Sequence, residues 1–307
     1  MPFAPSDFLP PEFLMVPAAA AFGAVFGSFL NVCIHRLPLD ESVVSPRSRC
    51  PGCRRMIAWY DNIPLVSWFV LRGRCRTCGE RFSFRYVAVE ALGAVLLALS
   101  ALRYLPDSPS AFAVASLLLL VAAAVAFIDL DHRIIPDELT LPLAAAGPVL
   151  SAIVPSIQTA GPSLLDAYIS PISGATPVAD ALAAIPSLPV RAVVLSLAGI
   201  AVGWGILAIV AAAGRLLFRR EAMGGGDLKW LAAIGGILGP EGAVLAFGLS
   251  CLAGSVAGLA RLAIRRDRVI PFGPFLSMGA VAVLFGQGEI IRFLTVALPE
   301  WLRTTIL

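Results

Sequence analysis

The chain is poor in charged residues, and lysine is almost absent from it. Charged residues make up 14% of the 307 residues and hydrophobic residues 58%, and the mean hydropathy is +0.86. A water-soluble domain carries about 25% charged residues, so this balance excludes a soluble globule. Lys229 is the only lysine, and the small net charge of +3 therefore rests on arginine.

A secretory signal is also lacking. Residues 1–12 contain Asp7 and Glu12 but no Lys or Arg. Because a signal peptide begins with a basic region, we expect the first apolar segment to be retained as a membrane span.

Apolar runs long enough to cross a hydrocarbon core of ~30 Å predict seven spans. They lie near 13–35, 86–105, 111–130, 139–157, 192–217, 243–264 and 271–287. A shorter run, 228–239, ends at Gly239-Pro240 and predicts either a short eighth span or a re-entrant half-helix. The sequence therefore predicts an all-α polytopic membrane protein with seven or eight transmembrane helices.

The arginines predict the orientation of these spans. They cluster in 36–85, 215–220 and 261–268, whereas 151–190 contains no basic residue. Alternate threading places every cluster on one side, which the positive-inside rule makes the cytoplasm. We therefore expect a multi-pass protein of the cytoplasmic (inner) membrane with its N-terminus outside and 158–190 as an external connection. The lipid bilayer is its expected partner, and no nucleic-acid partner is expected.

The first cytoplasmic loop, residues 36–85, contains two Cys-x-x-Cys pairs. The four cysteines are Cys50, Cys53, Cys75 and Cys78. Two such pairs complete a tetrahedral Cys₄ site, and disulfides are the weaker interpretation in a reducing compartment. The pattern predicts a structural zinc, with Gly52 and Gly79 suited to the turns around the sulfurs.

Two aspartates lie at the cytoplasmic ends of apolar segments. Asp129 ends the run 111–130, and Asp227 follows Gly224-Gly225-Gly226. A carboxylate at membrane depth costs ~2.5–3.5 kcal/mol on insertion scales, so it usually faces a polar cavity and has a function. Two carboxylates that meet can share one proton, which is the chemistry of an aspartyl protease. We predict that Asp129 and Asp227 form a catalytic pair, with Asp131 as the rival for the first position.

Other polar residues have weaker interpretations. Glu90 lies inside the second span and is expected to be paired or functional, and a polar contact with Asn31 of the first span is conceivable. His132 is expected to be a solvated turn residue. Asp137 and Glu138 follow Pro136 and are expected to cap the next helix.

Taken in order, these motifs resemble the type IV prepilin leader peptidase/N-methyltransferase family of GxGD-type integral membrane aspartyl proteases. Besides the two cysteine pairs and the two aspartate motifs, the matching stretches are Gly27-Ser28-Phe29-Leu30-Asn31-Val32-Cys33-Ile34-His35-Arg36-Leu37-Pro38, Asn62-Ile63-Pro64-Leu65-Val66-Ser67-Trp68, Arg85-Tyr86-Val87-Ala88-Val89-Glu90 and Ile270-Pro271-Phe272-Gly273-Pro274-Phe275-Leu276. A lone Gly-x-Gly-Asp is weak evidence, whereas this ordered set covers nearly the whole chain.

The resemblance implies a function. Such enzymes cut the basic leader from type IV prepilins and from type II secretion pseudopilins, and many then methylate the new N-terminal residue with S-adenosylmethionine. It maps the catalytic pair onto Asp129 and Asp227. We expect a methyltransferase-type region over 1–105 and a peptidase domain over 106–307, with Asn31 and Glu90 as candidate contacts to the methyl donor. No G-x-G-x-x-G follows a strand, so the soluble methyltransferase fold is not expected and methylation rests on the resemblance.

Two other classes of function stay open at this point. A membrane ion-coupled carrier would also place paired carboxylates beside a glycine-broken helix, but it would predict inverted repeats, which the sequence lacks. A non-catalytic assembly scaffold would explain the cysteines without using the aspartates.

Overall fold

The protein is mainly helical in the part of the chain that its structure, a computed structural model, describes. The described residues are 12–159, 164, 166, 176–219, 223–264 and 270–306. They contain no β-strand, and only two isolated β-bridges occur among them. The all-α class is confirmed. Contacts divide the chain into two compact units, Met1–Ile128 and Asp129–Leu307.

Six helical stretches within the described ranges are long and apolar enough to cross a membrane. They are Leu14–Leu39, Phe84–Tyr104, Pro109–His132, Leu188–Leu217, Gly225–Arg261 and Gly273–Thr304. The predicted run 139–157 corresponds to α5 (Asp137–Ile153), whose 17 residues rise only about 25 Å. The number of crossings therefore depends on α5, and it is seven if α5 crosses.

Glycines bring the two longest helices of the first unit together. α1 (Glu12–Arg36) packs against α3 (Phe84–Tyr104). Gly23, Gly27 and Gly93 face the opposite backbone so closely that a Cβ on any of them would overlap it. The spacing of Gly23 and Gly27 is the small-xxx-small pattern of membrane helix contacts. The close packing of α1 on α3 therefore sets the positions of the two ends of the loop that connects them.

The loop between α1 and α3 contains only short helices. They are η2 (Leu37–Leu39), η3 (Trp59–Asp61) and α2 (Val66–Val70). Arg36, the last residue of α1, donates hydrogen bonds to the carbonyls of Ser42 (2.8 Å) and Pro46 (2.7 Å). This anchors the first part of the loop at the end of α1. The unit is completed by the part of α4 (Pro109–His132) that precedes Asp129.

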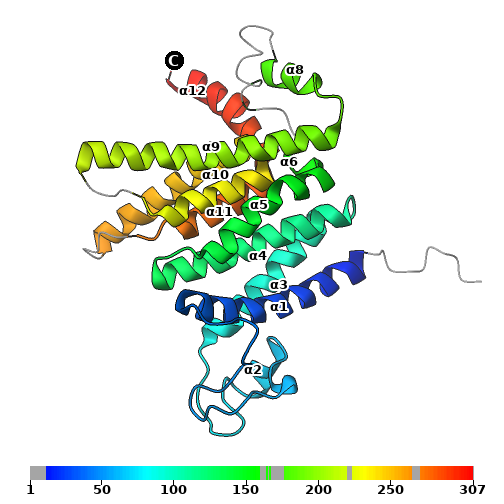
Figure 1. Ribbon diagram of the computed structural model, residues 1–307, viewed down its shortest axis with the longest axis vertical. Coiled ribbons are helices and arrows are strands. Elements are labelled where there is room, and N and C mark those ends of the chain that lie inside the picture. Colours follow the sequence, from blue (N-terminus) through cyan, green and yellow to red (C-terminus); the bar gives the residue numbers. More distant parts are fainter. Residues whose placement is uncertain are drawn as a thin grey trace, which may run out of the picture. The chain divides into compact units, whose positions relative to one another are not determined.

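The second unit is a bundle of long helices. In chain order its elements are α5, α6 (Ser156–Thr159), α8 (Pro177–Ala183), α9 (Leu188–Phe218), α10 (Gly225–Ile264), α11 (Gly273–Arg292), the π-helical turn η4 (Phe293–Ala297) and α12 (Leu298–Ile306). α9 and α10 lie side by side (Figure 1). Gly199 and Gly235 face each other between them, which allows the backbones to meet.

α10 is interrupted where the sequence predicts a break. Gly239 has φ 77° and ψ 179°, outside the helical region, and Pro240 follows it. Proline has no N–H, so the carbonyl four residues earlier loses its usual partner. That carbonyl, on Gly236, accepts hydrogen bonds from Ser151 (3.3 Å), Gln158 (3.1 Å) and Ser196 (2.6 Å). The kink is therefore built into the core by side chains of the neighbouring segments.

Two predicted features lie partly outside the described residues. Of the expected external connection 158–190, residues 160–163, 165 and 167–175 are not described, and of the arginine clusters, Arg220, Arg265, Arg266 and Arg268 are not described.

Candidate active site and metal centre

Asp129 lies in the last turns of α4 and is almost completely buried, with 6% of its surface exposed. Its Oδ2 accepts a hydrogen bond from the backbone N–H of Gly273, at 2.8 Å. A Cβ on Gly273 would lie only 2.7 Å from that oxygen, so only glycine lets the start of α11 approach the carboxylate this closely. No role was predicted for Gly273, although it lies in the stretch 270–276 that resembles the family.

Asp227 lies in the first turn of α10, where the helix dipole favours a negative charge. Ile135 lies between the segments that carry the two aspartates. A Cβ on Gly226 would lie 2.8 Å from the Ile135 Cβ, and one on Gly273 would lie 3.1 Å from its Cδ1. Asp129 and Asp227 are close enough for the charge of one to act on the other. The structure thus places the two predicted carboxylates within electrostatic reach of each other.

An ion pair joins the same two segments. Lys229 Nζ donates to both carboxylate oxygens of Asp137, each at 2.7 Å, across 92 positions in the sequence. Asp137 begins α5 as expected, but its side chain binds Lys229 instead of capping the helix. The side chains are 37% and 50% exposed, so the pair contributes only ~0–1 kcal/mol. The ion pair is therefore a minor contribution to the packing of α5 against α10.

The neighbouring polar residues are more exposed. Asp131 and His132 are both exposed, whereas Asp129 is buried. His132 is exposed to solvent as expected, but it is the last residue of α4 rather than a turn residue. The exposure of Asp131 places the rival carboxylate in a more open environment than Asp129.

The four loop cysteines form one cluster in the first unit. Their sulfur atoms all lie within 4.8 Å of one another, and the Cys50 and Cys78 sulfurs are 3.6 Å apart. A tetrahedral site with metal–sulfur distances of ~2.3 Å needs sulfurs ~3.8 Å apart. All four are free thiols, and the cluster could hold a metal ion.

Each cysteine pair lies on a tight turn of the same design. In the first turn Arg54 N–H donates to the Cys50 carbonyl (2.9 Å), and in the second Gly79 N–H donates to the Cys75 carbonyl (2.9 Å). Arg54 and Gly79 both have positive φ, 56° and 75°. The left-handed position in the first turn is thus Arg54 and not Gly52. Gly52 serves a close approach instead, because a Cβ there would lie 3.1 Å from Glu80.

The second turn also prepares a thiolate. Backbone N–H groups of Cys78 and Thr77 donate to the Cys75 sulfur and lower its pKa to about 6. The thiolate is the form that binds a metal. The pKa of Cys78 is raised to about 12, against the N–H of Glu80, because burial and the neighbouring thiols oppose a further negative charge. A bound cation would remove that opposition.

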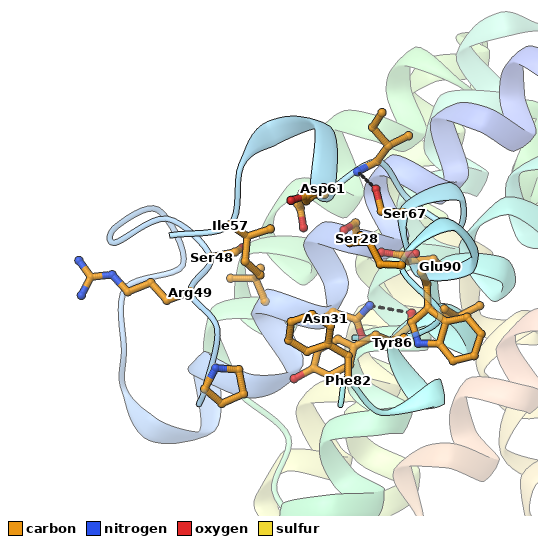
Figure 2. Close-up of a pocket in the computed structure, with 18 of the residues that line it drawn as sticks. Ser28, Asn31, Ser48, Arg49, Ile57, Asp61, Ser67, Phe82, Tyr86 and Glu90 are labelled. Atoms are coloured by element: carbon orange, nitrogen blue, oxygen red, sulfur yellow. Dashed lines mark hydrogen bonds between the residues drawn. The ribbon is translucent and has the colours of Figure 1, made fainter. Parts of the chain in front are cut away.

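A pocket of about 200 Å³ lies between α1, α3 and their connecting loop (Figure 2). The lining residues include Ser28, Asn31, Arg49, Asp61, Ser67, Trp68, Arg74, Phe82, Tyr86 and Glu90. Asn31 Nδ2 donates to the Tyr86 carbonyl at 3.0 Å. The two residues singled out in the spans, Asn31 and Glu90, therefore share one pocket, although their side chains bind backbone groups rather than each other.

Glu90 holds an unusual turn over this pocket. Its Oε2 accepts a hydrogen bond from the N–H of Leu65 at 2.7 Å. Leu65 has φ 62° and ψ −56°, and Val66 N–H donates to the Pro64 carbonyl at 2.7 Å. This is a γ-turn of the rare, strained kind. Sequence reasoning missed it, because a Pro-Leu-Val stretch gives no signal for positive φ.

Together the fold and these sites define a polytopic membrane protein with a paired-carboxylate site in one unit and a tetrathiol loop in the other. Residues 21–104 match the model of the bacterial peptidase A24 N-terminal domain, and residues 114–259 match that of the type IV leader peptidase family. No solved structure matches the chain.

Curated relatives match along nearly their whole length. The prepilin leader peptidase/N-methyltransferase of Aeromonas hydrophila is 35% identical over 302 residues, which cover 89% of this chain and 92% of the relative. That of Aeromonas salmonicida (strain A449) is 34% identical over 315 residues, with 93% of each chain covered. That of Bacillus subtilis (strain 168) is 31% identical over 286 residues, which cover 90% and 97%. The chain belongs to the prepilin leader peptidase/N-methyltransferase family.

Proposed function

We propose that this protein removes the basic leader peptide from type IV prepilins or type II secretion pseudopilins and then N-methylates the new terminal residue. The single observation that carries the proposal is that buried Asp129 lies within electrostatic reach of Asp227 in a chain of this family. Burying a carboxylate at membrane depth costs free energy, so a purely structural role for these aspartates is disfavoured.

In the proposed cleavage the two aspartates share the work of acid and base. The ionised carboxylate takes a proton from a water molecule, and the protonated one polarises the scissile carbonyl. The roles exchange during the reaction, so neither is assigned to one residue. Gly273 N–H holds Asp129 Oδ2 in place. Gly225, where a Cβ would meet nothing within 4 Å, leaves room for an extended substrate segment beside Asp227. The substrate must be extended there, because the carbonyls of a helical segment are enclosed and hydrogen-bonded.

In the proposed methylation the pocket of the first unit binds S-adenosylmethionine. Its lining suits a zwitterion with a flat base, because it offers acidic Glu90, basic Arg74 and the ring of Phe82. The carboxylate of Asp61, which also lines the pocket, is paired with Arg76. The bound cofactor supplies the methyl group. Glu90 accepts the proton of the substrate amine, which must be neutral to attack, while Asn31 fixes the α3 backbone at Tyr86.

We propose that the two activities belong to two successive regions of the chain. Residues 1–105 carry methylation, and residues 106–307 carry cleavage. Zinc is the ion proposed for the tetrathiol cluster, because four thiolates at tetrahedral spacing suit it best. The N-terminus is proposed to lie outside, with both sites at the cytoplasmic face of the inner membrane, on the positive-inside argument.

The experiment that tests the whole proposal uses the purified protein with a prepilin and labelled S-adenosylmethionine. The mass of the pilin product is measured. We expect the loss of the leader and the gain of one methyl group. An unchanged precursor would refute the cleavage, and a shortened but unlabelled product would refute the methylation alone.

Loss of one metal ligand is expected to unfold the loop and spare the rest. Cys50→Ser should lower the bound zinc from about one ion per chain to a small fraction, since metal binding carries much of the folding free energy of such a loop. Elemental analysis measures the zinc, and limited proteolysis measures the loop. The control is Cys251→Ser, which changes a cysteine outside the cluster. Wild-type protein purified without chelator that held less than half an ion would contradict the prediction.

Adding a single methyl group at Gly273 is expected to impair cleavage, because the methyl carbon would overlap the Asp129 carboxylate. Gly273→Ala should displace the Asp129 carboxylate or break its hydrogen bond and slow cleavage by at least ~10-fold, or ~1.4 kcal/mol of barrier. The control is Gly288→Ala in the same helix, where a Cβ meets nothing within 4 Å. Rates are measured with a prepilin in membranes at equal expression. Equal rates for the two variants would remove Gly273 from the site.

A further inference from the structure

We infer that the tip of the first loop, residues 63–70, enters the lipid of the membrane that α1 and α3 cross. The segment exposes large apolar side chains that the rest of the fold covers only in part. They are Ile63, Val66, Phe69 and Val70, between 41% and 69% exposed. A contiguous apolar surface of this kind marks a contact with a protein or a membrane.

The depth of the tip is set by its contact with α3. Leu65 N–H binds the carboxylate of Glu90, which is six residues inside α3 counted from Phe84. At 1.5 Å per residue this is ~9 Å along the helix. Because Phe84–Tyr104 is a candidate membrane span, the turn at Leu65 lies beside the span rather than beyond its end.

α1 gives the same depth independently. Ser28 lies eight residues before the last residue of α1, Arg36, or ~12 Å along the helix. Ser28 and Ser67 line the same pocket, with Glu90 beside them (Figure 2). The loop therefore folds back along both helices and brings α2 to a level inside the apolar stretch.

Several polar groups of the tip form hydrogen bonds within the loop, as contact with lipid requires. A segment in lipid must satisfy its backbone internally. The N–H groups of Val66, Ser67 and Phe69 donate to carbonyls of residues 63–65. The polar side chain of Ser67 is buried, where it accepts from Ile63 N–H (2.9 Å) and donates to the Tyr60 carbonyl (3.1 Å).

The two faces of α2 differ accordingly. Trp68 packs on Phe84, with ring centroids 5.5 Å apart, whereas Phe69 meets only the edge of Trp68 in this cluster and stays 63% exposed. Arg72, two residues after α2, is exposed, which suits anionic headgroups at the interface. The position beside two spans and this charge favour the bilayer over a protein as the occupant.

Photocrosslinking in phospholipid vesicles tests the inference. p-Benzoylphenylalanine replaces Phe69 in the full chain, reconstituted in phosphatidylethanolamine and phosphatidylglycerol, and adducts are identified by mass. The matched control is Val44, which is 85% exposed in the bend that Arg36 anchors at the end of α1. Val95, exposed in the middle of α3, is the positive control. Val70 serves as a second position should the Phe69 variant fail to assemble.

The expected result is phospholipid adducts at position 69 approaching the yield at position 95 and several-fold above that at position 44. A yield equal to that at position 44 would overturn the inference, as would adducts to residues 129–307 of the same chain. Adducts to an added prepilin that replace the lipid adducts would assign the face to a protein partner instead.

Discussion

Replacing either Asp129 or Asp227 by asparagine is expected to abolish cleavage. Asparagine preserves the shape of the side chain, and it can still accept the Gly273 hydrogen bond at position 129, but it cannot cycle a proton. Acid–base groups contribute typically ~10²–10⁴-fold to rate, so the rate should fall by at least this amount. The measurement is cleavage of a prepilin in membranes at equal expression of each variant.

The double variant and two neighbouring carboxylates provide the controls. Because a dyad acts as a unit, the double variant should be little worse than either single one. Asp137→Asn should be mild, since it removes only an exposed ion pair. Asp131→Asn should also retain cleavage. If Asp131→Asn alone lost activity, the first catalytic position would move to that residue, and substantial cutting by the Asp129 variant would refute the dyad.

The second large effect is expected on methylation alone. Glu90→Gln keeps an oxygen that can accept the Leu65 hydrogen bond but removes the carboxylate charge. We expect it to keep the loop folded and to lower methyl transfer by ~10²-fold or more, as loss of a proton acceptor does, with cleavage unchanged. Transfer of labelled methyl groups to an already cut pilin measures the effect.

The variants of Glu90 and Asp129 together test the separation of the two activities. Glu90→Leu removes the hydrogen bond as well, so it should also release the turn at Leu65. A protease digestion of the loop would then distinguish it from Glu90→Gln. Asp129→Ala should leave the methylation of a cut pilin intact. If that variant lost both activities while it stayed folded, the picture of two separate sites would be wrong.

The sequence predicted what depends on local pattern. Apolar runs predicted the helices because membrane spans need only length and composition, and the two Cys-x-x-Cys pairs predicted the tetrathiol cluster because each pair fixes its own turn. The break at Gly239-Pro240 was also predictable, since it depends on two adjacent residues. The number of membrane crossings was less predictable, because α5 ends at Ile153, before the end of the apolar run 139–157.

Contacts between distant positions were not predictable in the same way. Gly273 reaches Asp129 across 144 positions, and Lys229 reaches Asp137 across 92. Neither partner has a local signal, because each contact is created by the packing of separate helices. The γ-turn at Leu65 has the same origin: Glu90, 25 positions away, holds a conformation that the turn sequence does not favour.

The amine of Lys229 is a unique site for chemical labelling of a side chain. Because no other lysine occurs in the chain, an amine-reactive dye can modify only one side chain, two residues from Asp227. That side chain is 37% exposed, so reagents can reach it from solution. Its labelling rate reports whether a substrate covers the entrance to α10. Occupancy could thus be followed in a catalytically dead variant, where no product forms.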